Sequence, residues 1–207
     1  MDPSVASFTV LAVVLAITPG ADTMVVLKNT VQGGTKRGLM TMVGVKLGTV
    51  THALLASLGL AAVLVQYSAL YSIIKYVGAA YLVWLGVLTM YKAIRGGAKA
   101  LQVGEPVATS LVRALGQGYL SNVLNPKVVL FYVAVLPQFV QPTDPVLLKS
   151  ISLGAIHIVA SATWLTLVAL FVGALGAWIA RPRVRRVLDS LSGFALLGFG
   201  LRVALSK

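Results

Sequence analysis

The sequence comprises 207 residues, of which 58% are hydrophobic and 11% charged, and its mean hydropathy is +0.92. A soluble domain carries about a quarter charged residues, so this composition excludes a soluble globular fold and predicts an integral membrane protein. The absence of cysteine excludes disulfides and thiolate metal sites, and the net charge of +12 lies in short clusters between apolar runs, which favours membrane topology over nucleic-acid binding.

Six apolar stretches are predicted to be transmembrane helices, because each has about the 20 residues that a helix needs to cross the hydrocarbon core. Backbone groups in lipid must bond within their own segment, so we expect an all-α membrane protein. No positive charge precedes the first stretch, which is also longer than the apolar core of a secretion signal, so it is interpreted as a mature span. The predicted spans are Val5–Leu27, Leu39–Leu64, Tyr71–Tyr91, Gly116–Pro137, Ile151–Leu175 and Val187–Leu205.

The first span is interrupted by the run Thr18-Pro19-Gly20-Ala21-Asp22. Proline removes an amide donor and glycine loosens the backbone, so the helix is predicted to break here and to leave carbonyl groups that need partners. Asp22 follows the break directly, and a carboxylate inside a span indicates a functional site. The alternative is that Asp22 only caps the half-helix that begins after the break, where a negative charge is stabilised.

The second span carries a lysine, Lys46, a turn or two inside its predicted start. We expect its side chain to extend to the cytoplasmic interface, as long cationic side chains do, and a contact with Asp22 is the alternative. Gly44 and Gly48 in the same span permit a close helix contact. The sequence leaves open whether that contact lies within one chain or between copies of a homo-oligomer.

Two histidines and two tryptophans within the spans are secondary candidates for the site. His52 and His157 are interpreted as hydrogen-bonded packing residues, with a proton relay as the alternative. Trp84 and Trp164 lie near the middle of the third and fifth spans, where packing is the expected role and a cavity wall the alternative.

The connection between the third and fourth spans, residues 92–115, is the longest in the chain, and it is basic and rich in glycine. It is predicted to be a cytoplasmic linker between two halves of three spans each, residues 1–91 and 116–207. Because three is an odd number of crossings, the second half enters the membrane from the opposite side. If the halves are related, they form an inverted repeat, a common plan of transporters.

Three features recur at similar positions in the two halves. Pro19 and Pro126 lie deep inside the first span of each half, and each middle span contains one histidine. The last span of each half has spaced glycines, Gly78 and Gly86 in one and Gly193 and Gly200 in the other. The sequence therefore predicts two inverted three-helix repeats, with the first helix of each repeat broken at its proline.

The fourth span contains Asn122, Asn125, Pro126 and Lys127. The two asparagines are three residues apart and share one helix face. A lone ammonium at this depth costs at least about 2.5–3.5 kcal/mol, so Lys127 needs a partner. We expect that partner to be Asp22, across the two broken helices. The alternative is that Lys127 binds backbone carbonyl groups that the break has freed.

Basic residues predict the orientation of the chain. Those in short loops stay cytoplasmic, and eleven of them fall in connections that lie on the same side of the predicted topology. Both termini are therefore expected to face away from the cytoplasm. The eleven are Lys28, Lys36, Arg37, Lys92, Arg95, Lys99, Arg113, Arg181, Arg183, Arg185 and Arg186.

Several sequence blocks carry a resemblance to a known family. They are residues 18–22, Lys28-Asn29 with the glycines that follow, Lys75–Leu82, Asn125-Pro126-Lys127 and Leu136–Phe139. With them the chain resembles the lysine exporter superfamily, and within it the homoserine/threonine efflux (RhtB) branch, over nearly its whole length. Residues 18–22 look like the Pro-Gly-Pro-Asp/Asn signature of that family, except that Ala21 replaces the second proline. The resemblance implies a six-helix exporter of amino acids or close derivatives, driven by the proton gradient.

The residues and the resemblance together predict a secondary transporter of the bacterial inner membrane, not an enzyme, with no cofactor and no metal. Its expected substrates are threonine, homoserine or other neutral amino acids, exchanged for protons. Asp22 is expected to hold the substrate ammonium or a proton, and Lys127, Asn125 and Asn122 to meet the carboxylate. Alternatives are a non-transporting membrane subunit, and an exporter of basic amino acids or cations; a single central carboxylate disfavours hard cations.

Overall fold

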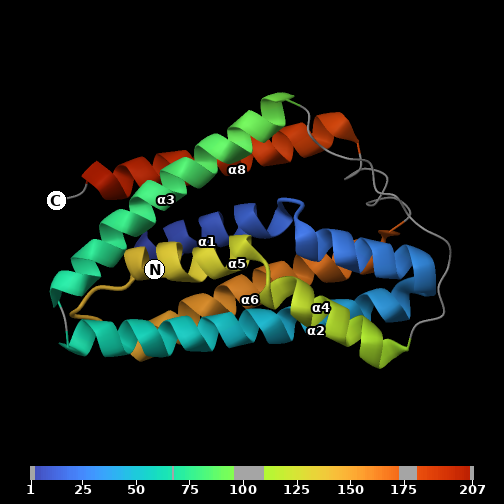
Figure 1. Ribbon diagram of the computed structural model, residues 1–207, viewed down its shortest axis with the longest axis horizontal. Coiled ribbons are helices and arrows are strands. Elements are labelled where there is room, and N and C mark those ends of the chain that lie inside the picture. The colour runs from blue at the N-terminus through green and yellow to red at the C-terminus, as the bar shows by residue number, and fades with distance from the viewer. Residues whose placement is uncertain (1–2, 67, 96–109, 173–180, 206–207) are drawn as a thin grey trace.

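The computed structural model describes residues 3–66, 68–95, 110–172 and 181–205. Within these ranges every regular element is a helix, as predicted (Figure 1). The linker expected at residues 92–115 lies largely outside the described residues. The elements are α1 Pro3–Ile17, α2 Ala21–Gln66, α3 Ser68–Arg95, α4 Leu111–Val123, α5 Pro126–Leu130, the π-helical turn η1 Phe131–Val135, the 3-10 turn η2 Leu136–Phe139, α6 Val146–Leu170 and α8 Pro182–Leu205.

Each predicted span coincides with one or more of these helices. By length and composition alone, two helices in the described residues are apolar enough to cross a membrane, Ala21–Ala62 and Val146–Leu170. The bent pair Leu111–Val123 and Pro126–Phe139 would add a third crossing. The chain is therefore an integral membrane protein, and the count of six crossings stays a prediction.

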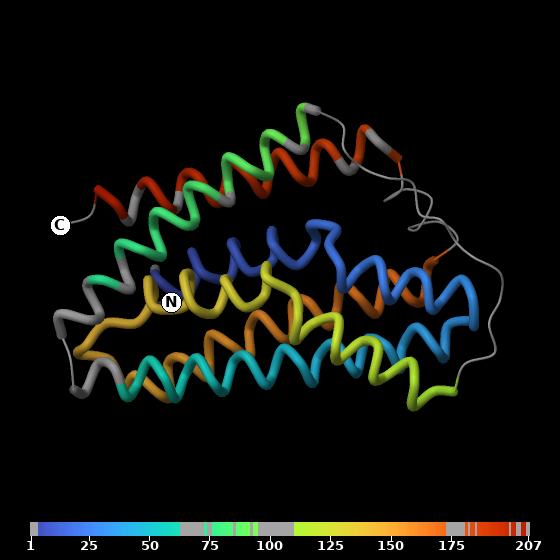
Figure 2. The backbone as a smooth tube through the Cα atoms, viewed as in Figure 1, coloured from blue at the N-terminus to red at the C-terminus, as the bar shows by residue number. Residues whose placement is uncertain are grey.

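Helix α2 doubles back on itself at Gly34. Its 46 residues would extend about 69 Å if straight, roughly twice the hydrocarbon core. Gly34 has φ 79° and ψ 170°, a conformation that residues with a side chain rarely adopt, and the chain reverses there (Figure 2). The predicted bounds left residues 28–38 as a loop of eleven residues between the first two spans. That prediction is wrong, because both legs of α2 stay helical up to Gly34.

The second leg of α2 packs closely on α4 and α6. A Cβ atom built on Gly44 would lie 2.9 Å from the backbone nitrogen of Tyr119, and one on Gly48 would lie 2.9 Å from the Cβ of Asn122. Only glycine permits helices to approach this closely. The contact that these two glycines predicted is therefore made within the chain.

Helices α3 and α8 form a pair that packs mainly against itself. They run side by side along one edge of the molecule, beside the layers formed by the other helices (Figure 1). Gly86 and Gly193 meet at their contact, where a Cβ on Gly86 would lie 3.0 Å from the Gly193 carbonyl oxygen. Because α3 belongs to the first predicted half and α8 to the second, the two halves interlock.

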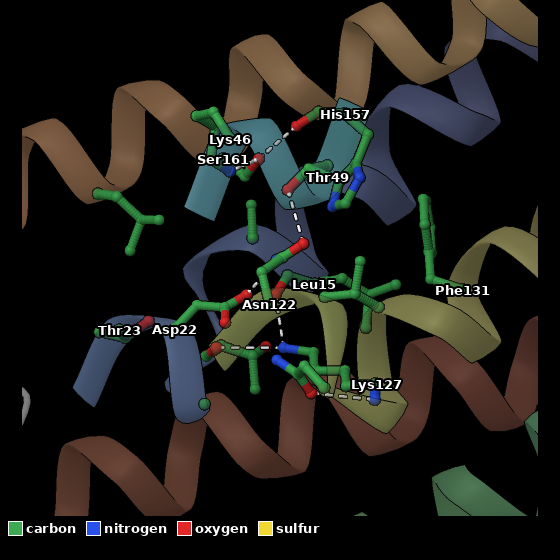
Figure 3. Close-up of a pocket in the computed structure, with 16 residues that line it drawn as sticks. Leu15, Asp22, Thr23, Lys46, Thr49, Asn122, Lys127, Phe131, His157 and Ser161 are labelled. Carbon is green, nitrogen blue, oxygen red and sulfur yellow. Dashed lines mark hydrogen bonds between the residues drawn. The ribbon is translucent and has the colours of Figure 1, made fainter. Parts of the chain in front are cut away.

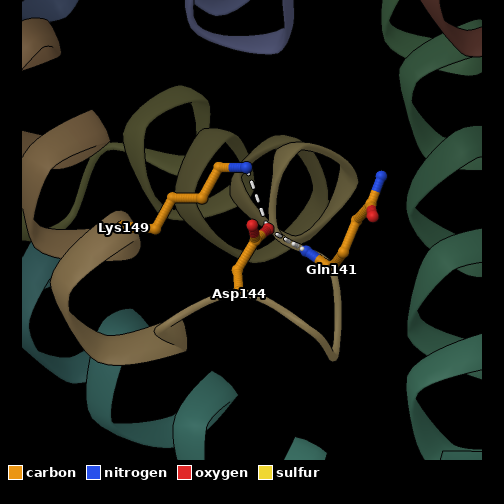
Figure 4. A network of polar contacts seen from close by, with 3 residues as sticks. All are labelled: Gln141, Asp144 and Lys149. Carbon is orange, nitrogen blue, oxygen red and sulfur yellow. Dashed lines mark hydrogen bonds and ion pairs between the residues drawn. The ribbon is translucent and has the colours of Figure 1, made fainter. Parts of the chain in front are cut away.

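The loop between η2 and α6 is held by an ion pair. Lys149 Nζ lies 2.8 Å from Asp144 Oδ2, which also accepts a hydrogen bond from the backbone nitrogen of Gln141 at 2.7 Å (Figure 4). This loop lies at the end of the molecule where α1 begins and α8 ends (Figure 1). The Gly34 reversal lies at the opposite end, together with the starts of α4 and α8.

Candidate functional site

Both predicted helix breaks are present. Thr18, Pro19 and Gly20 separate α1 from α2, and Leu124 and Asn125 separate α4 from α5 at a bend of 49°. Pro126 is the first residue of α5, a position where its missing amide proton is not needed. Two broken helices therefore meet in the middle of the fold.

A cavity lies where the breaks face each other and is lined by α1, α2, α4, α5 and α6 (Figure 3). Its volume is about 50 Å³, on a scale on which a single water molecule needs about 10–15 Å³. The cavity therefore has room for a few small groups. Its polar lining residues are Thr18, Asp22, Thr23, Lys46, Thr49, Asn122, Asn125, Lys127, His157 and Ser161.

Asp22 lies in the first turn of α2 and is oriented toward α4. Asn122 Nδ2 donates a hydrogen bond to Asp22 Oδ2 at 2.7 Å, and Ser121 Oγ donates to Oδ1 at 3.4 Å. The positive end of the α2 dipole favours a carboxylate here. The carboxylate is therefore bound by the neighbouring broken helix, and the helix dipole stabilises its charge.

The direct ion pair expected between Asp22 and Lys127 is wrong for this structure. Lys127 Nζ donates instead to the carbonyl oxygens of Leu15 at 2.8 Å and Thr18 at 3.2 Å. These carbonyls are freed where α1 ends, and the negative end of its dipole attracts a cation. The alternative partner, freed backbone carbonyl groups, is the one observed.

Asn122 and Asn125 are both buried but have different contacts. Asn125 is the N-cap of α5, and its Oδ1 accepts a hydrogen bond from the backbone nitrogen of Lys127 at 3.1 Å. Asn122 binds Asp22 and lies 3.4 Å from the Thr49 hydroxyl. Asn125 therefore shapes the break, whereas the amide of Asn122 belongs to the cavity.

Lys46 also points into the cavity, so the expectation that it extends to the interface is wrong. Its Nζ donates to Ser161 Oγ of α6 at 2.6 Å, and Ser161 in turn donates to the His157 carbonyl oxygen at 2.7 Å (Figure 3). The cavity thus holds two ammonium groups and one carboxylate. Sequence reasoning missed Ser161, although it follows His157 by four residues and so shares its helix face.

The two histidines are hydrogen-bonded, which fits their interpretation as packing residues. The Tyr132 hydroxyl lies 3.1 Å from His157 Nδ1, and His157 lines the cavity. His52 Nε2 lies 3.3 Å from the Asn122 carbonyl oxygen, and its ring stacks on Tyr132. His52 lines a separate apolar groove with Tyr132.

The two tryptophans differ in position. Trp164 is partly buried beside the apolar cluster around Val26 and Leu165. Trp84 lines a second cavity, between the breaks and the α3–α8 pair, together with Pro19 and Pro126. The Thr18 and Ser192 hydroxyls are hydrogen-bonded at this side. The expected packing role therefore fits Trp164, and the alternative of a cavity wall describes Trp84.

Interrupted membrane helices that aim dipole ends and charged groups at a shared cavity are an architecture of membrane transport proteins. A comparison with family models gives the particular family. Residues 13–207 match the model of the LysE type translocator, and the chain belongs to this family. It is accordingly a translocator and not an enzyme, as predicted.

Individual relatives are similar over nearly the whole chain. An uncharacterised membrane protein of Bacillus subtilis, YrhP, is 33% identical over 98% of this chain and 99% of its own length. An uncharacterised membrane protein of Vibrio cholerae is 29% identical over 97% of this chain and 96% of its own. The leucine efflux protein of Salmonella choleraesuis is 30% identical over 96% of this chain and 93% of its own. No solved structure matches the chain.

Proposed function

We propose that the protein is a secondary active exporter of neutral amino acids, such as threonine, homoserine or leucine, coupled to protons by antiport. The observation that carries the proposal is the central cavity, where a carboxylate and two ammonium groups line one space between two broken helices. A free amino acid is a zwitterion that presents the same two charges. The similarity to a leucine efflux protein supports an amino-acid substrate.

Each charged group has a role in this proposal. The substrate ammonium binds Asp22, and the substrate carboxylate binds Lys127 and Lys46. Lys127 leaves the carbonyl groups of Leu15 and Thr18 for the substrate carboxylate. A proton competes with the substrate ammonium for Asp22, so binding of one releases the other. This competition for a single carboxylate is the simplest basis for antiport.

Basic amino acids, the alternative substrates, differ from neutral amino acids in their net charge. A basic amino acid carries a second positive charge on its side chain. In the central cavity that charge would lie near Lys46 and Lys127, and the repulsion between like charges at such distances is unfavourable. A neutral zwitterion adds no net charge. The lining of the central cavity therefore favours neutral over basic amino acids, and a non-transporting subunit would need no such cavity.

The proposed topology has six crossings, with both termini facing away from the cytoplasm of a bacterial inner membrane. The Gly34 reversal and the start of α8 lie at the same end of the molecule (Figure 1). Both carry exposed basic residues, Lys36 at the reversal and Arg181 and Arg183 at the start of α8, which supports this orientation. The inverted repeat is supported by the contact of α3 with α8, because these are equivalent helices of the two proposed halves.

Transport by the purified full-length protein in proteoliposomes tests the function. Vesicles loaded with unlabelled amino acid should take up labelled threonine, homoserine or leucine by counterflow, and labelled lysine much less. An imposed pH gradient should drive net movement. Lys46→Met should lower counterflow, whereas Lys36→Met, which removes an exposed lysine outside the cavity, should not. Absence of counterflow for every amino acid by the folded wild type would refute the exporter proposal.

A further inference from the structure

A second cavity lies on the other side of Lys127 from the central one. It is lined by α3 and α8 in addition to the broken helices, and it encloses about 500 Å³, against about 50 Å³ for the central cavity. Eight of its thirteen lining residues are apolar or aromatic, and the other five, Thr18, Thr89, Lys127, Asp189 and Ser192, are polar or charged. The apolar or aromatic residues are Leu15, Pro19, Tyr81, Trp84, Leu88, Pro126, Leu130 and Leu196.

The two cavities share a wall of three residues, Leu15, Thr18 and Lys127. Hydrogen bonds hold this wall closed. Lys127 Nζ binds the carbonyl oxygens of Leu15 and Thr18, and the Thr18 hydroxyl binds that of Ser192 on α8. A carboxylate that draws Lys127 away from these carbonyl groups therefore removes part of the partition.

The two cavities differ in size and lining, and each suits a different part of an amino acid. The central cavity has the charges for an ammonium and a carboxylate but room for only a few small groups. The four carbons of a leucine side chain need further space with apolar walls. The second cavity offers that space beside Lys127, the residue expected to hold the carboxylate.

We propose that the second cavity is the side-chain pocket of the transporter. It binds the apolar side chain of an amino acid whose charged groups lie at Asp22 and Lys127, and Trp84 forms a principal contact. This rests on the proposed function and adds a substrate class: amino acids with medium-sized apolar side chains, such as leucine, are bound more tightly than alanine.

The test compares two zwitterions that differ only in their side chains. Counterflow of labelled leucine and of labelled alanine is measured in proteoliposomes with the wild type, Trp84→Ala and Tyr76→Ala. Tyr76 is a matched control, because it is also an aromatic residue of α3, is 53% exposed against 56% for Trp84, and does not line the cavity. We expect Trp84→Ala to raise the half-saturating concentration of leucine about fivefold and that of alanine less than twofold.

A second readout does not depend on transport. Leucine should raise the Tm of the purified wild type and of Tyr76→Ala more than alanine does, and this difference should disappear in Trp84→Ala. If lipid chains fill the second cavity instead, Trp84→Ala will affect both amino acids equally, which overturns the pocket. Equal stabilisation of the wild type by leucine and alanine, or none by either, also overturns it. If the protein transports both amino acids but Trp84→Ala raises their half-saturating concentrations by the same factor, the side-chain pocket is refuted and the exporter proposal still holds.

Discussion

Lys127 Nζ lies 2.8 Å from the carbonyl oxygen of Leu15, so a cation from the second broken helix binds the end of the first. The same ammonium is 3.2 Å from the Thr18 carbonyl oxygen. These two bonds join the breaks on opposite halves of the chain. They also explain how an ammonium group is tolerated inside the fold although it makes no ion pair with Asp22.

The first prediction concerns these carbonyl groups. Lys127→Met should destabilise the protein by about 1–3 kcal/mol, because it leaves two buried acceptors without their donor. Adding Asp22→Leu should not restore stability, since Asp22 does not bind Lys127 directly. Thermal unfolding in detergent measures both variants, with Lys36→Met as the exposed control. Recovery of stability in the double variant would show that the two charges are partners after all.

The second prediction separates the coupling role of Asp22 from a structural one. Asp22→Asn should abolish net export driven by a pH gradient but keep some exchange of labelled for unlabelled substrate. Asparagine can still accept a hydrogen bond from Asn122 through its side-chain oxygen, but it cannot bind and release a proton. Net export and counterflow are measured in the same vesicles. Normal proton-driven export by this variant would exclude Asp22 from coupling.

The third prediction concerns Lys46. Lys46→Met should raise the half-saturating substrate concentration by roughly tenfold, because it removes one of the two cations proposed to bind the carboxylate, and a charge-assisted hydrogen bond contributes about 1.5–3 kcal/mol. Ser161→Ala removes only the partner of that lysine, so it should have a smaller effect. Counterflow kinetics compare the two. An effect of Ser161→Ala as large as that of Lys46→Met would mean that the bond orders the helices and does not serve the substrate.

The fourth prediction concerns the packing of α2 on α4. Gly44→Ala should destabilise the protein by about 1–3 kcal/mol, because the new Cβ would meet backbone atoms of Leu115 and Tyr119 that cannot move aside. Gly59→Ala is the matched control in the same helix, where nothing lies within 4 Å of the new Cβ. Unfolding temperatures of the two variants give the answer, and equal values would contradict this packing.

The fifth prediction concerns orientation. Because the sequence has no cysteine, single cysteines can be introduced at two exposed positions, Lys36 beside the Gly34 reversal and Thr143 in the loop between η2 and α6. These two segments lie at opposite ends of the molecule (Figure 1). A maleimide that cannot cross the inner membrane is added to intact cells whose outer envelope has been made permeable to it. It should label position 143 and leave position 36 unlabelled. The reverse pattern would invert the proposed topology.

Features decided by local chemistry could be predicted from the sequence. Pro19 and Pro126 each remove an amide donor, and the helices break beside both of them. The long apolar runs predicted helices in the right places. Asp22, Asn122 and Lys127 were expected to share a site, and they line one cavity.

Features that depend on how helices are rotated could not be predicted. The direction of the Lys46 side chain follows from the reversal at Gly34. The reversal sets the rotation of the second leg of α2 about its own axis, and with this rotation Lys46 points toward Ser161. A loop of eleven residues would have left that rotation undetermined. Likewise, the choice of Lys127 between a carboxylate and two carbonyl groups depends on distances across the breaks, and sequence spacing contains no information on them.

The reversal at Gly34 also has a consequence for biogenesis. Because a single residue separates the two legs of α2, no extended loop exists there that could be held outside the membrane while one leg waits for the other. The first two spans are therefore expected to leave the translocon together as a helical hairpin, with Lys36 and Arg37 keeping its tip in the cytoplasm. A side chain at position 34 should accordingly lower the amount of protein inserted into the membrane, before any effect on the transport rate of the molecules that do insert.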